Sequence, residues 1–182
     1  MANYITVNTT GDFPALLLTT DVANSTHANG VPFANGFLGG NIMSVVCLQD
    51  VTVTNSTGIF SWTDFCSASI NKVTTPSDNE VSTNIVIDPE GWFGNSSFTP
   101  NTAAAFYGVS GLSENRIEIS FRVQLNDNTG VANIAANGTY YYCGKGYISS
   151  LAPTVSPDSP VWVSPVTIAV NGDMSSGVGT GS

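Results

Sequence analysis

Side chains that could form a catalytic centre are scarce in this sequence. His27 is its one histidine, so any Ser-His-Asp or Cys-His arrangement must use it. It lies in a stretch rich in Gly and Asn, beside Thr26 and Asn29, a composition typical of a solvated loop. We therefore interpret His27 as a loop residue rather than a catalytic base.

Carboxylates and metal ligands give no stronger signal. A glycosidase needs two carboxylates across a cleft, but Glu118 falls on the outer face of an expected strand and Glu90 in an expected turn. One histidine and three scattered cysteines offer no zinc-ligand spacing. Residues 126–130 carry oxygen ligands that calcium accepts, without the acidic density of a calcium loop. The sequence predicts no enzyme, no cofactor and no metal.

The cysteines leave two arrangements open. Cys47, Cys66 and Cys143 are an odd number, which allows one disulfide with a free thiol or three reduced thiols. Cys47 lies in an apolar run, and Cys143 follows three tyrosines. We favour buried thiols that act as small hydrophobic side chains.

The polar part of the composition indicates a contact surface. Charged residues make up 9% of the chain, against about 25% in ordinary domains. Ser, Thr and Asn number 21, 20 and 18. Such a surface loses less side-chain entropy on packing than one rich in Lys, Arg and Glu. A secreted or extracellular β domain shows the same bias and stays an alternative.

Charge and the N-terminal residues exclude further classes. A net charge of −9 with no basic run disfavours direct binding of nucleic acid or of anionic membranes. Residues 1–7 lack the positive and apolar regions of a signal peptide, so we expect synthesis in a host cytoplasm. The few basic residues are Lys72, Arg116, Arg122 and Lys145.

Alternating hydrophobic patterns predict strands along the whole chain. The clearest is 116–125, where Ile119, Phe121 and Val123 face one way. Ser120, Arg122 and Gln124 then face solvent, as in a half-buried strand. One short helix is expected at 102–107. The other expected strands are 4–7, 15–20, 41–54, 59–65, 69–74, 81–87, 131–135, 139–149 and 166–170.

This pattern predicts an all-β fold. Many short strands with Gly, Pro and Asn turns indicate a sandwich or barrel. Long loops near His27 and Trp92 favour a single jelly roll, a Greek-key β-barrel or sandwich of 8–10 strands with at most one short helix. We expect one domain over residues 1–170 and a flexible Gly/Ser-rich tail over 171–182.

Aromatic clusters supply the candidate contact surface. Trp92, Phe93 and Phe98 lie together in an expected loop, where burial is less automatic than in a strand. Tyrosines at 140–142 and 147 could stack on a sugar, although alternation in a strand would bury every second ring. We predict that Trp92, Phe93 and Phe98 form a contact surface.

The chain resembles single jelly-roll capsid or capsid-decorating proteins of icosahedral viruses. The resemblance lies in the strand pattern from 15 to 170, the weakly charged surface and the absence of a signal peptide. The resemblance is greatest to the small major capsid proteins of tailless, membrane-containing viruses of haloarchaea and Thermus. It rests on architecture, so no site residues are transferred. It implies a virion protein that packs with itself and other capsid proteins near an internal membrane. The alternative function is a carbohydrate-binding or adhesive β-sandwich that binds sugar through exposed aromatics.

Overall fold

The computed structural model describes residues 15–20, 43–45, 48–63, 70–95, 104–125, 140–157, 161–172 and 174–178. Most of them lie in strands. The elements in chain order are β1 (Ala15–Thr19), β2 (Met43–Val45), β3 (Leu48–Ser56), β4 (Ile59–Trp62), β5 (Asn71–Thr74), β6 (Asp78–Val86), α1 (Pro89–Phe93), α2 (Ala104–Glu114), β7 (Ile119–Gln124), β8 (Tyr140–Leu151), β9 (Val163–Val170) and β10 (Ser175–Val178).

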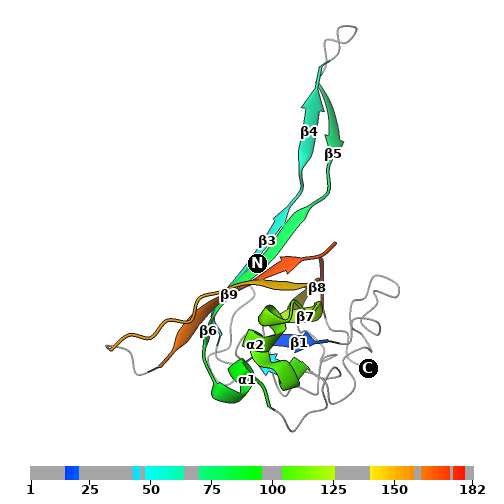
Figure 1. Cartoon of the computed structure of the whole chain (residues 1–182). Coiled ribbons are helices and arrows are strands. Elements are labelled where there is room, and N and C mark those ends of the chain that lie inside the picture. The colour runs from blue at the N-terminus through cyan, green and yellow to red at the C-terminus, as the bar shows by residue number, and fades with distance from the viewer. Residues whose placement is uncertain are drawn as a thin grey trace, which may run out of the picture.

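Eight of these strands form one antiparallel sheet. Its order is β2-β1-β7-β8-β9-β6-β3, with β10 also paired to β8. The two remaining strands, β4 and β5, pair with each other and continue the β3–β6 hairpin away from the body (Figure 1). The all-β class and the expected strand number are thus confirmed, while the jelly-roll connection stays a prediction.

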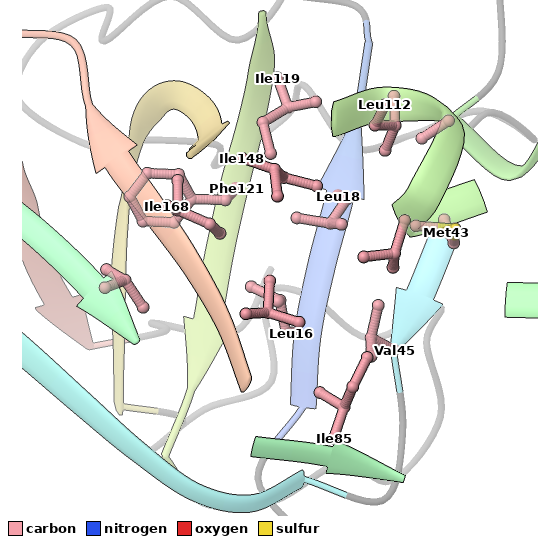
Figure 2. Close-up of a cluster of buried hydrophobic side chains, with 14 of the residues drawn as sticks. Leu16, Leu18, Met43, Val45, Ile85, Leu112, Ile119, Phe121, Ile148 and Ile168 are labelled. Atoms are coloured by element: carbon pink, nitrogen blue, oxygen red, sulfur yellow. The ribbon is translucent and has the colours of Figure 1, made fainter. Parts of the chain in front are cut away.

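The hydrophobic core lies on the face of the sheet that α2 covers. Leu18, Phe121 and Ile148 come from three neighbouring strands, and Leu112 reaches them from α2 (Figure 2). Phe121 is opposite Gly144, where an added Cβ would stand 3.1 Å from the ring. Alternation explains this face, because every second side chain of a strand points to the same side.

Strand β7 is buried on both faces, whereas the sequence predicted a half-buried strand. All six residues of β7 are buried, including Ser120, Arg122 and Gln124. Leu17, on neighbouring β1, is buried on this same side. Alternation assigns residues to two faces, but only tertiary packing decides whether both faces are covered.

The helices also differ from the prediction of at most one. The turn expected at Glu90 is instead the start of α1, where the Asp88 carboxylate accepts a hydrogen bond from the Gly91 N–H at 3.0 Å. Asp as N-cap and Pro in the first turn are standard helix-start residues. The second helix, α2, runs well beyond the expected 102–107. Neither described helix is long and apolar enough to cross a membrane.

The segment 171–182, expected to be a flexible tail, contains a strand. β10 pairs antiparallel with the first residues of β8, with Ser175 opposite Cys143. Pairing supplies the order that a Gly/Ser composition alone does not predict. Several predictions lie outside the described residues: the strands at 4–7 and 131–135, His27, the turn at 126–130, Cys47 and Cys66.

Candidate functional site

The aromatic residues singled out from the sequence have different positions. Trp92 lies in α1 with 5% of its surface exposed and belongs to the core. Phe93, next to it, is 66% exposed. Phe98 lies outside the described residues. Of the described pair, only Phe93 therefore has an exposed ring.

Exposed hydrophobic side chains gather instead on the projecting hairpin of β4 and β5, here called the arm. Ile59 and Phe60 are more than half exposed, although they lie in a regular strand. The Phe60 and Trp62 rings stack with their centroids 5.9 Å apart. Among the residues that the structure describes between 59 and 74, the exposed large hydrophobic ones are Ile59, Phe60, Trp62, Ile70 and Val73.

The pairing register places three of these side chains on one face. Phe60 is opposite Val73, and Trp62 is opposite Asn71. Directly opposed residues share a face and lie close enough to touch. Phe60, Trp62 and Val73 thus form an aromatic face, whereas Lys72 lies opposite Ser61 on the other side.

Hydrogen bonds link the two chains of the hairpin where the arm meets the β3–β6 pair. The Thr75 N–H donates to the Gly58 carbonyl at 2.8 Å. The buried Asn79 side chain accepts from the Ser56 N–H at 3.3 Å and donates to the Ser77 hydroxyl at 3.2 Å. The arm is therefore a directed extension of the β3–β6 hairpin.

The arm has no hydrophobic layer of its own within the described residues. A two-stranded ribbon exposes both faces and is marginally stable by itself in water. Clustered exposed hydrophobic side chains of this kind mark interaction sites. The sequence predicted both strands, but nothing in their alternation showed that neither face reaches the core.

A buried polar cluster around Arg122 lies on the face of the sheet opposite the hydrophobic core. The Arg122 guanidinium carbon stands 4.0 Å from the Tyr141 ring centroid. Arg122 is 1% exposed, and its Nε and Nη2 atoms have no hydrogen-bond partner among the described residues. Burial lowers the pKa of Arg122, while Tyr141 and then Cys143 raise it. This cluster places a buried positive charge beside the Tyr141 ring and the Cys143 thiol.

Cys143 is a reduced, buried thiol, as the sequence analysis favoured. Its sulfur lies 3.5 Å from the Ser175 carbonyl oxygen. Burial raises the pKa of Cys143 to about 12, although Arg122 lowers it. No group of three or more His, Cys, Asp or Glu side chains that could hold a metal occurs within the described ranges.

We expect Cys143 to resist alkylation in the folded protein. A thiol whose pKa is about 12 carries almost no thiolate at pH 8.5. Because the pKa of Cys143 is higher in the folded than in the unfolded protein, its protonated thiol stabilises the fold fully below pH 9.0. This contribution is lost as the pH rises towards 12. Peptide mass mapping after iodoacetamide treatment should find Cys143 labelled in urea but not in buffer. Equal labelling in both would contradict the buried position.

The described fold occurs in subunits of assembled particles. A chain from the "Virion of native gene transfer agent (GTA) particle" superposes with a TM-score of 0.51 and 11% identity, over 75% of this chain and 89% of that one. A chain from the "Tail of empty GTA particle computed with helical refinement, C6 symmetry" superposes with a TM-score of 0.51 and 12% identity, over 88% of this chain and 93% of that one. No protein-family model and no curated protein matches the sequence.

Proposed function

We propose that this protein is a structural subunit of a virion, which assembles with other copies through its arm and catalyses no reaction. The observation that carries the proposal is the arm itself. It projects from the sheet (Figure 1) and exposes five large hydrophobic side chains that the body of the protein does not cover. The similarity to subunits of the GTA virion and tail supports the same role.

Within a virion, the sequence favoured a shell or shell-decorating subunit near an internal membrane. The arm and the nearly full-length similarity to a tail subunit support a ring or tube instead. A projecting hairpin reaches along one direction, which suits stacking of subunits more than lateral tiling of compact ones. We therefore propose a tail-like position in the particle.

The test is assembly of the purified chain with and without the aromatic face of the arm. We expect the wild-type chain to form oligomers larger than its 18.9 kDa monomer. The variant Phe60→Ser/Trp62→Ser should remain monomeric, because it loses the two stacked rings, while its circular dichroism stays unchanged. Size exclusion with light scattering measures the mass, and negative-stain microscopy separates tubes or rings from closed shells.

Phe93→Ser is the comparison variant for this experiment. It removes an exposed aromatic ring from the body, and it also probes the surface that the sequence predicted around Trp92, Phe93 and Phe98. If Phe93→Ser abolishes assembly and the arm variant does not, that predicted surface makes the contact. A wild-type chain that stays monomeric at its highest soluble concentration would contradict self-assembly.

Sugar binding is the second candidate function. The stacked and exposed Phe60 and Trp62 rings are the feature that favours it, because aromatic faces pack against sugar rings. A glycan array with wild-type protein, repeated with Phe60→Ser/Trp62→Ser, tests it. Binding of a glycan by the wild-type protein but not by the arm variant would support this function. An array without any bound glycan would contradict it.

A further inference from the structure

A second hydrophobic projection lies at the other end of the molecule. The described residues that extend β8 and β9, 151–157 and 161–163, pair antiparallel and are here called the distal hairpin. Thr154 and Val163 pair through two backbone hydrogen bonds of 2.8 and 3.2 Å. This register places Val155 opposite Trp162, and both side chains are about half exposed. Val161 beside them is also exposed.

Strand β6 holds the two projections apart. The arm joins β6 at its first residue, Asp78, through the short connection 75–77. Past the last residue of β6, the Ile87 N–H donates to the Trp162 carbonyl at 2.8 Å. The nine residues of β6 span about 25–30 Å at the rise of a strand. The arm points away from the distal hairpin (Figure 1), so it cannot contact its own copy's Trp162.

Both projections carry little charge in an acidic protein. Residues 57–77 contain one lysine and one aspartate, which cancel, and residues 147–163 contain one aspartate. The whole chain carries −9. Bodies of like charge repel each other, so copies can approach most easily where neutral, hydrophobic segments meet. Their low charge thus allows these two hydrophobic segments of different copies to meet without strong repulsion.

From these observations we infer that the arm of one copy docks on the distal hairpin of the next copy. The inference rests on the proposed function and names the surface that receives the arm. The aromatic face of Phe60, Trp62 and Val73 packs on Val155 and Trp162 of the neighbour. Because the two surfaces differ, the contact is heterologous and repeats in one direction, which builds a ring or an open stack.

Variants blocked at one end test this contact. The arm-blocked variant is Phe60→Ser/Trp62→Ser, and the distal-blocked variant is Val155→Ser/Trp162→Ser. Each removes exposed side chains only, and circular dichroism verifies the fold. Each variant alone should be monomeric, with its self-association weakened about 30-fold or more, the loss typical of a central interface residue. An equimolar mixture should form a dimer and nothing larger, because it retains one intact arm and one intact distal hairpin.

Light scattering on the variants and their mixture decides between the outcomes. If the distal-blocked variant assembles like wild type and the arm-blocked variant does not, this inference is overturned. The proposed function then stays intact. An arm-blocked variant that assembles normally overturns the proposed function itself. A mixture that stays monomeric also overturns the head-to-tail contact. Tyr147→Ser, which removes another exposed ring from β8, is the matched control and should assemble normally.

Discussion

Replacing Gly108 by alanine lowers the free energy of unfolding by about 3–5 kcal/mol, the sum of backbone strain and steric overlap. Gly108 lies inside α2 with φ 65° and ψ 175°, a conformation that is close to exclusive to glycine. A Cβ there would stand 2.3 Å from the Gly94 nitrogen and 2.5 Å from the Trp92 oxygen. Both contacts are backbone atoms, so no side chain can move aside.

This prediction is measured by urea unfolding followed by tryptophan fluorescence and circular dichroism. Gly111→Ala is the matched control in the same helix. Its Cβ would meet only the Tyr107 and Asn115 side chains, at 3.3 Å or more, so its effect should lie within about 1 kcal/mol of zero. Equal effects at Gly108 and Gly111 would contradict the close approach of α1 and α2.

Replacing Arg122 by methionine raises the free energy of unfolding by about 1–3 kcal/mol, because a buried charge without a partner costs more than its contacts return. Arg122 is fully enclosed, and two of its nitrogens donate to no described group. Its contact with the Tyr141 ring recovers part of the desolvation cost. Methionine keeps the hydrophobic stem of the side chain and removes the charge.

Arg116→Met is the control for this substitution. Arg116 is exposed after the end of α2, and its replacement should change stability by no more than about 0.5 kcal/mol. Denaturant midpoints of both variants give the comparison. A destabilised Arg122→Met variant would mean that the contacts of the guanidinium outweigh its desolvation cost, and it would reverse our interpretation of this cluster.

The strands were predictable because their signals are local. Ile119, Phe121 and Val123 alternate with polar residues, and the structure places all three in the core. The expected strands 41–54 and 59–65 are separate in the structure too, where β3 ends at Ser56 and β4 begins at Ile59. The start of α1 was also present in Asp88 and Pro89, but the same two residues begin turns as readily as helices, so the sequence could not decide between them.

The candidate site was less predictable, because exposure is a property of the whole fold. Trp92 and Phe60 both follow glycine-containing segments and look alike in sequence. In the structure, Trp92 is buried as part of the core, whereas Phe60 is exposed on the arm. No periodicity distinguishes a hydrophobic strand inside a sheet from one that extends beyond it.

The sequence by itself determined the all-β class, the position of most strands and the shortage of groups that could do chemistry, since these depend on residue type and on a period of two. Tertiary structure alone decided that both faces of β7 are covered, that Arg122 is enclosed and that β4 and β5 project from the body. The physical reason is that burial depends on which segments, distant in sequence, come to lie against a side chain. Such contacts leave no signal in the local pattern.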